Sequence, residues 1–167
     1  KGVRLGLSTL ENTAFAVANA LASLAIESHA SLLPLATLLE NVAGIYSAVI
    51  NRVKVYVRPT AEFGLDGASG FNLFALLQYL QDVQTEATIL VPQLLSALVL
   101  AAEKGLPVHS GFKFIAVGGA KTSPMLLSRA QAVGLPVDDR HVVDRRRLWR
   151  SRAKRLCLCS NGIFRRG

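Results

Sequence analysis

The chain has 167 residues, of which 51% are hydrophobic, and a formal net charge of +8. This length and composition suit one domain with a buried core and exclude a largely disordered protein. The longest uncharged runs, 12–26 and 87–102, fall short of the roughly 18 to 20 apolar residues of a membrane helix, so we predict no membrane span and a cytoplasmic location. The absence of an initiator Met and of an apolar leader leads us to expect that the chain begins within a longer protein or is a processed piece.

The positive charge is concentrated at the carboxyl end. Residues 1–137 hold 9 basic and 8 acidic residues, a net charge of +1, whereas residues 138–167 hold 10 basic and 3 acidic residues, a net charge of +7. The chain is therefore predicted to consist of a partial large domain at 1–137 and an irregular basic tail at 138–167.

The amino-terminal half shows helical and strand patterns in alternation. The run Ser8-Thr9-Leu10-Glu11 is typical of a capping box, in which a hydroxyl and a carboxylate satisfy free N–H groups of the first helical turn. It predicts an alanine-rich helix to about Ile26. The elements predicted next are a strand at 30–33, a helix at 37–50 and a strand at 53–57.

The second half repeats the alternation, with proline and glycine at the helix ends. Pro92 and Pro124 suit the first turns of two helices, and Gly105 and Gly134 suit their ends. Strands alternating with helices predict an α/β fold: a partial doubly wound, largely parallel sheet with helices on both faces. The elements predicted here are helices at 71–83, 92–104 and 124–133, and strands at 88–91, 113–117 and from 135.

The stretch VGGAKTSP, residues 117–124, has the composition of a phosphate-binding loop. The common nucleoside-triphosphate loop requires Gly, four residues and then Gly-Lys-Ser/Thr. Here Ala120 precedes Lys121, and Ile115 stands where the first glycine belongs. The stretch is therefore not such a loop, and we expect Lys121 to be solvated.

Four segments together resemble AMP-forming, adenylate-forming enzymes, the superfamily of acyl-CoA synthetases, luciferases and peptide-synthetase adenylation domains. The segments are KGVRLGLS, SLLPLATLLENVAG, ATILVPQLLSAL and FIAVGGAKTSPMLL, and their order and separations are similar to those of the family. The resemblance covers about residues 1–137 and is greatest to long-chain fatty acyl-CoA synthetases. It implies that 1–137 is a fragment of an AMP-binding ligase domain.

The resemblance also implies the site residues. Lys1 and Gly2 would be the remnant of the phosphate loop. Gly118, Gly119 and Ala120 would form a wall of the acyl and adenylate pocket, where a backbone with little side chain allows close approach. Thr37 would lie at the same pocket, in a position where family members often carry histidine. We assign no catalytic residue and no metal ligand.

The implied reaction joins a fatty acid or other small carboxylate to ATP, giving acyl-adenylate and pyrophosphate, and then forms acyl-CoA. The parent enzyme would use ATP, Mg²⁺ and coenzyme A. The family's Tyr-Gly-x-Thr/Ser-Glu signature, which serves adenine and magnesium, is expected after residue 137 and is absent from this sequence. We therefore expect the isolated chain to be inactive and to bind none of these cofactors tightly.

Single histidines and cysteines give no catalytic pattern. His29 lies at the edge of a predicted strand without an evident carboxylate or cysteine partner and is interpreted as structural. His109 lies in a predicted loop and is interpreted as solvated. Cys157 and Cys159 lack the spacing of a zinc site and are expected to be reduced thiols.

The tail has two interpretations. Its abrupt onset in place of the family signature favours a change of reading frame or a misassembled end. The alternative is a non-enzymatic α/β scaffold whose basic arm, with Trp149, binds nucleic acid or other anions. We favour the first and do not expect nucleic-acid binding. An incomplete sheet with unpaired edges would favour self-association.

Overall fold

The computed structural model describes residues 5–66 and 70–142. Within them, one five-stranded sheet has the order β2-β1-β5-β6-β7, and every neighbouring pair is parallel. The predicted α/β class and parallel sheet are confirmed. The strands are β1 Ser28–Ser31, β2 Lys54–Val57, β5 Ala87–Leu90, β6 Phe114–Val117 and β7 Val137–Val142, and a small antiparallel pair is formed by β3 Leu65–Asp66 and β4 Gly70–Phe71.

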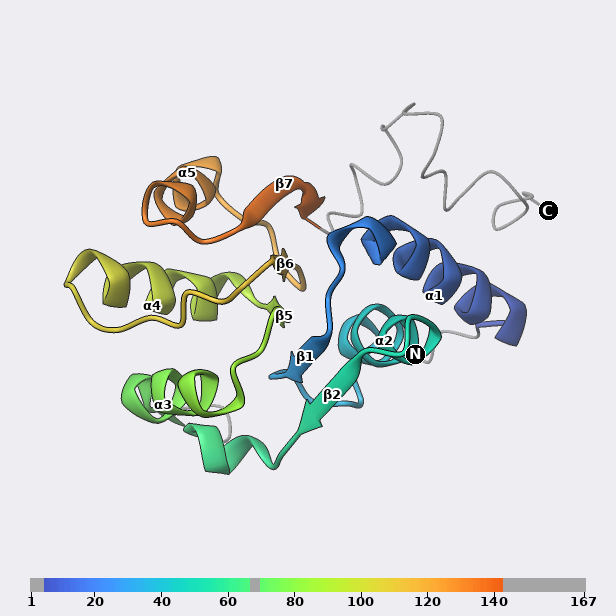
Figure 1. Cartoon of the computed structure of the whole chain (residues 1–167), viewed down its shortest axis with the longest axis horizontal. Coiled ribbons are helices and arrows are strands. Elements are labelled where there is room, and N and C mark those ends of the chain that lie inside the picture. Colours follow the sequence, from blue (N-terminus) through green and yellow to red (C-terminus); the bar gives the residue numbers. More distant parts are fainter. Residues whose placement is uncertain (1–4, 67–69, 143–167) are drawn as a thin grey trace.

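Helices cover both faces of the sheet, as predicted. Figure 1 shows α1 and α2 on one face and α3, α4 and α5 on the other. The described residues include no helix that is both long and apolar enough to cross a membrane. The helices are α1 Leu7–Leu21, the 3₁₀-helix η1 Ala22–Leu24, the π-helix η2 Leu39–Tyr46, α2 Ser47–Ile50, the 3₁₀-helix η3 Thr60–Phe63, α3 Leu73–Val83, α4 Pro92–Glu103 and α5 Pro124–Ala132.

The strand order explains why the helices divide between the faces. The chain steps from β1 to β2 in one direction, and from β2 past β1 to β5, β6 and β7 in the other. Crossovers between parallel strands are almost always right-handed, so reversing the direction of the step moves the connecting helix to the opposite face. The helices η2 and α2 therefore lie opposite α3, α4 and α5.

The main core lies between the sheet and α3 and α4. Leu76 and Leu80 are four residues apart in α3 and share one helix face, and both are fully buried. Leu95 and Leu98 of α4 are likewise fully buried. Burying one such leucine contributes about 1.5 to 3 kcal/mol.

Most helix ends were predicted correctly, but one cap was not. Pro92 and Pro124 begin their helices, and Gly105 and Gly134 follow the helix ends with φ of +72° and +80°. The predicted capping box is wrong: α1 begins at Leu7 with Gly6 as N-cap and no side-chain cap. Because the helix begins before Ser8, that hydroxyl lies within the first turn.

Two segments differ in kind or length from the prediction. The helix predicted at 37–50 begins at Leu39, and its first eight residues are π-helical. The last strand, predicted to begin at 135–137, is β7 Val137–Val142, which ends five residues past the predicted domain boundary. The remainder of the predicted tail, 143–167, lies outside the described residues.

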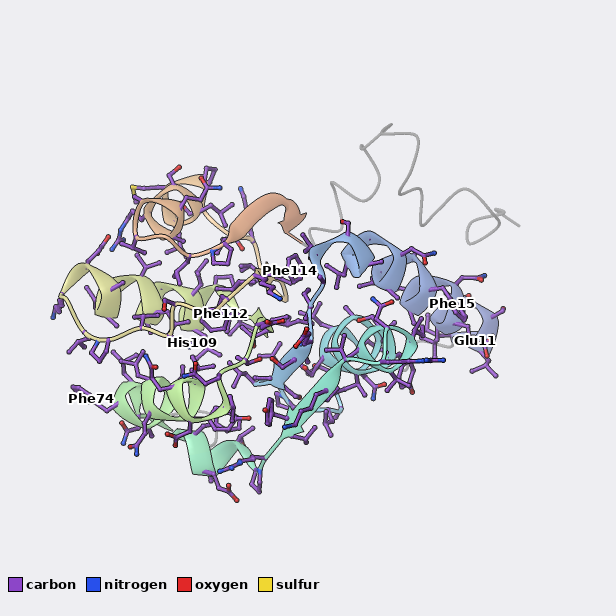
Figure 2. All side chains as sticks on the ribbon, viewed as in Figure 1. Glu11, Phe15, Phe74, His109, Phe112 and Phe114 are labelled. Atoms are coloured by element: carbon purple, nitrogen blue, oxygen red, sulfur yellow. The ribbon has the colours of Figure 1, made fainter. Side chains whose placement is uncertain are left out.

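The prediction that His109 is solvated is wrong. His109 is 4% exposed, and its Nε2 lies 2.8 Å from the Thr85 carbonyl oxygen. Its ring meets Phe112 edge-on with centroids 4.9 Å apart, and the two residues lie next to each other in Figure 2. A Cβ at Gly111 would come within 2.6 Å of the ring, so the glycine leaves the room that this burial needs.

A polar network joins the amino ends of the central strands. Glu86 Oε1 lies 2.8 Å from Lys113 Nζ, and Glu86 Oε2 accepts a hydrogen bond from the Glu27 N–H at 2.7 Å. Lys113 Nζ also donates to the Ala25 carbonyl oxygen at 2.8 Å. The hydrogen bond from Lys113, followed by that from the Glu27 N–H, lowers the pKa of Glu86.

This network predicts an acid-dependent loss of stability. Because the pKa of Glu86 is lower in the folded chain than in the unfolded chain, its contribution is present above the usual carboxyl range and is lost as pH falls through the folded value. The free energy of unfolding of the wild type should fall more steeply between about pH 5 and pH 3 than that of Glu86→Gln, as measured by urea denaturation. Lys113→Met should flatten the slope in the same way, and equal slopes for all three would contradict the assignment.

Candidate functional site

The strand order reverses at β1, so the connections after β1 and β5 begin next to each other at the carboxyl edge of the sheet. The connections from these neighbouring strands leave toward opposite faces, and ligands of open α/β sheets bind where such connections diverge. Three loops leave the carboxyl edge there: residues 32–38 after β1, Val91 after β5, and residues 118–123 after β6. These loops contain the sequence-predicted pocket residues that the structure describes.

The loop after β1 is exposed but internally bonded. The backbone N–H and the hydroxyl of Thr37 both donate to the Pro34 carbonyl oxygen at 2.9 Å. Asn41 Nδ2 donates to the Leu35 carbonyl oxygen at 3.0 Å, which joins the loop to η2. Residues 34–38 are all exposed, so Thr37 lies at the surface of the carboxyl edge.

The loop after β6 is shaped by its glycines. The Gly118 N–H donates to the Leu90 carbonyl oxygen at 3.0 Å, which ties the end of β6 to the end of β5. Gly119 has φ +83°, a conformation that L residues rarely adopt. Gly119, Ala120 and Lys121 are exposed and Gly118 is buried, so the predicted solvation of Lys121 is confirmed.

The fold therefore brings Thr37 and residues 118–120 to one edge, with the start of α4 between them. Lys1 and Gly2 lie outside the described residues, so their predicted place in the site stays a prediction. Thr122, which the sequence did not single out, is 8% exposed, and its hydroxyl has no hydrogen-bond partner within the described residues. A buried hydroxyl without a partner is unusual in a folded chain.

His29 has a carboxylate partner, which the interpretation of the sequence did not find. His29 Nε2 lies 2.9 Å from Glu40 Oε1, and the two side chains are 7% and 0% exposed. The partners are eleven residues apart, one on β1 and one on η2, so no local motif joins them. One feature of the sequence could have indicated the pair: Glu40 is a charged residue within the apolar pattern of the helix predicted at 37–50.

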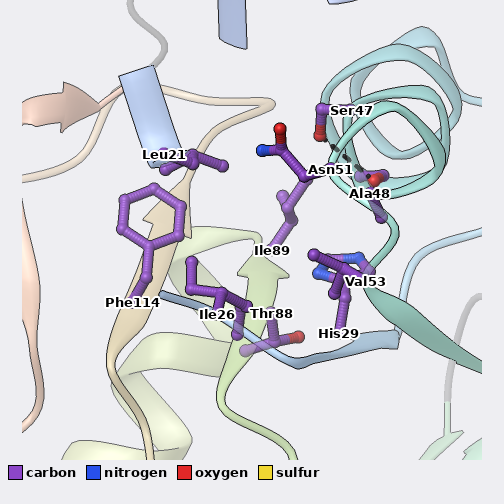
Figure 3. A pocket seen from close by; sticks show the side chains of 12 residues that line it. Leu21, Ile26, His29, Ser47, Ala48, Asn51, Val53, Thr88, Ile89 and Phe114 are labelled. Atoms are coloured by element: carbon purple, nitrogen blue, oxygen red, sulfur yellow. Dashed lines mark hydrogen bonds between the residues drawn. The ribbon is translucent and has the colours of Figure 1, made fainter. Parts of the chain in front are cut away.

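A small pocket lies beside this pair, between the sheet and the layer of α1 and α2 (Figure 3). Its volume is about 30 Å³, enough for a water molecule but not for an adenylate. Among its polar side chains, Asn51 donates to the Ala18 carbonyl oxygen at 2.8 Å and Thr88 to the Ala30 carbonyl oxygen at 2.9 Å. The pocket is therefore part of the packing and not the substrate site.

The described residues contain no group of three or more histidine, cysteine, aspartate or glutamate side chains that could hold a metal ion. What they provide at the carboxyl edge is backbone, hydroxyl and apolar surface. The described part of the edge can line a bound molecule, and it holds one exposed lysine, Lys121, along with the hydroxyls of Thr37 and Thr122.

Solved structures with a similar fold include several coenzyme A ligases. The chain is similar to O-succinylbenzoate coenzyme A synthetase from Bacillus subtilis, with a TM-score of 0.59 and 18% identity over 82% of this chain and 27% of that one. A malonyl-CoA ligase gives a TM-score of 0.62 and 20% identity over 82% of this chain and 28% of that one. A long-chain-fatty-acid-CoA ligase from Archaeoglobus fulgidus gives a TM-score of 0.57 and 19% identity over 80% of this chain and 25% of that one.

The chain has the fold of part of a coenzyme A ligase. The resemblance to adenylate-forming enzymes is thereby confirmed at the level of fold. The chain spans about a quarter of the length of each ligase. No protein-family model matches the sequence, and no curated sequence is similar to it.

The conformation of Gly119 gives a stability prediction at the ligase-fold edge. Gly119→Ala should lower the free energy of unfolding by about 1 to 2 kcal/mol because a Cβ is disfavoured at φ +83°. The added Cβ would also lie 3.3 Å from Val91 Cγ1. Chemical denaturation measures the combined effect of the backbone conformation and of this contact on the free energy of unfolding.

Gly134→Ala is the matched control, because Gly134 has φ +80° and a Cβ there would meet nothing within 4 Å. Gly119→Ala should cost at least as much as Gly134→Ala. A neutral Gly119→Ala would contradict the described turn.

Proposed function

We propose that this chain is part of an ATP-dependent, AMP-forming acyl-CoA synthetase that acts on a fatty acid. The observation that carries the proposal is the convergence of the Leu-Pro-Leu, Val-Pro and Gly-Gly-Ala segments at the carboxyl edge of a sheet with the ligase fold. In the proposed reaction, a carboxylate oxygen attacks the α-phosphorus of ATP and pyrophosphate leaves. The thiol of coenzyme A then attacks the acyl carbon, AMP leaves, and the thiol proton is released.

In this proposal, Gly118, Gly119 and Ala120 form a wall of the acyl and adenylate pocket, and Thr37 lies on the opposite loop. The exposed backbone of Gly119 supports this role because it allows close approach of a planar or phosphorylated group, whereas Gly118, in the same turn, is buried. Leu35 and Leu38 of the Thr37 loop are 43% and 55% exposed, which favours an apolar acyl chain over a charged one.

The cofactors of the proposed parent enzyme are ATP, Mg²⁺ and coenzyme A. The Bacillus subtilis synthetase was solved in complex with ATP and magnesium ion, and the malonyl-CoA ligase with methylmalonyl-CoA and AMP. Magnesium would neutralise phosphate charge where it binds. Since the described residues include no cluster of metal ligands, they support a lining role only.

We further propose that the isolated chain does not catalyse the reaction. The described residues include no cluster of metal ligands, and the sequence lacks the adenine and magnesium signature after residue 137. The basic-arm alternative concerns residues outside the described part, and it stays a prediction. Self-association and a cytoplasmic location also stay predictions.

Pyrophosphate release tests the proposed inactivity. The purified 167-residue chain, incubated with ATP, Mg²⁺ and palmitate, should release no pyrophosphate above a reaction without protein. The reaction requires groups that stabilise the negative charge developing on the phosphates, such as a bound metal ion, and the described residues include no cluster of metal ligands. Palmitate-dependent release would overturn the proposal.

Binding of an acyl-adenylate analogue tests the proposed site itself. A hydrolysis-resistant palmitoyl-adenylate analogue at millimolar concentration should shift the amide NMR signals of Thr37 and of residues 118–120, because these loops form the proposed walls. AMP, which lacks the acyl chain, should produce smaller shifts at Thr37, because the exposed Leu35 and Leu38 of that loop favour an apolar chain. Shifts spread evenly over α3 and α4, or none at the two loops, would contradict the proposed site.

A further inference from the structure

The buried His29–Glu40 pair connects the beginning of β1 to the beginning of η2. His29 is the second residue of β1, and Glu40 is the second residue of η2, so their contact closes the intervening chain into a loop. The distance from Nε2 to Oε1 is 2.9 Å, and Glu40 is fully buried. The loop that the pair closes contains Thr37 and the exposed leucines of the candidate site.

Gly44 gives the pair its space. A Cβ at this position would lie 2.6 Å from Glu40 Oε1 and 2.9 Å from His29 Nε2, closer than real Cβ contacts. Any residue other than glycine would push the histidine or the glutamate aside. Gly44 also lies within the π-helical turns of η2, and π-helical turns are frequent at functional sites.

Stability alone does not explain this pair. Glu40 Oε2 is buried and has no hydrogen-bond partner within the described residues. Removing a carboxylate from water is costly, and two well-packed apolar side chains often stabilise a protein as much as a buried charged pair does. Buried polar pairs of this kind are best attested as devices that select one geometry among several.

Two hydrogen bonds join the loop to the first turn of η2. Asn41 Nδ2 donates to the Leu35 carbonyl oxygen, and the Asn41 N–H donates to the Thr37 carbonyl oxygen, both at 3.0 Å. Since residues 34–38 are exposed, they have little packing of their own to hold them in place. The position of the loop relative to the sheet therefore depends on how the first turn of η2 is attached to β1.

We propose that His29 and Glu40 form a latch that sets the position of residues 34–38 at the carboxyl edge, with Gly44 as the glycine that allows the latch to close. His29 and Glu40 are positioning residues and touch no ligand in this role. The latch is a property of the free chain, so the proposal does not rest on the proposed enzymatic function.

Amide hydrogen exchange on the free chain tests the latch in the double variant His29→Leu/Glu40→Leu. This variant removes both polar groups together, so neither is left buried without its partner. Exchange at the amides of Thr37 and Asn41 should become about tenfold faster, a factor that corresponds to about 1.4 kcal/mol. The Gly118 amide, bonded to the Leu90 carbonyl oxygen, should keep its rate.

The comparison with Gly118 separates the latch from a general loss of stability. A variant that is merely less stable exchanges faster at all three amides, and that result would overturn the proposal. Unchanged exchange at Thr37 and Asn41 would overturn it as well. His29→Gln, which retains a nitrogen donor toward Glu40, should keep the protection of both amides.

Two further variants complete the test. Gly44→Ala should release the same two amides by forcing the pair apart, and it decides the question if the double variant fails to fold. The matched control is Glu103→Leu/Arg129→Leu, which removes an exposed ion pair of 2.6 Å between α4 and α5. The control should leave Thr37 and Asn41 unchanged, and uniform acceleration in Gly44→Ala would overturn the latch.

Discussion

The pairing of β1 with a strand on each side is the constraint on which the rest of the structure depends. β1 aligns with β2 over four residues and with β5 through His29 and Ala30. The shorter contact is reinforced by the Thr88 hydroxyl, which donates to the Ala30 carbonyl oxygen, and by the Glu86 N–H, which donates to the Ser28 hydroxyl. If β1 did not pair with β5, the loop after it would not lie beside the loops after β5 and β6, and the candidate site would not exist.

This central position also explains why β1 is polar although it is buried. Its sequence, Ser-His-Ala-Ser, is buried throughout, whereas inner strands of parallel sheets are usually continuous apolar runs. Buried polar groups must find hydrogen bonds. Ser28 and His29 find theirs outside their own strand, at the start of β5 and on η2. Hydrogen bonds from side chains of β1 thereby connect it to both β5 and η2.

The sequence predicted what local chemistry determines, and it missed contacts between distant residues. Proline at a helix start and glycine after a helix end act within a few residues, so Pro92, Pro124 and Gly105 gave correct boundaries. The partners of His29 and His109 lie 11 and 24 residues away, and their burial depends on how the chain folds back. Periodicity alone predicts only an ordinary turn at Gly-Gly-Ala. Its assignment to the candidate site came from the resemblance to adenylate-forming enzymes.

Nuclear Overhauser contacts across β1 test the central claim most directly. The register predicts backbone contacts from Ala30 to both Tyr56 on β2 and Thr88 on β5 in the free chain in solution. Observing both contacts would establish β1 as an inner strand and the divergence of connections beside it. Contacts to only one of the two strands, or from Ala30 to β6, would contradict the strand order and the candidate site built on it.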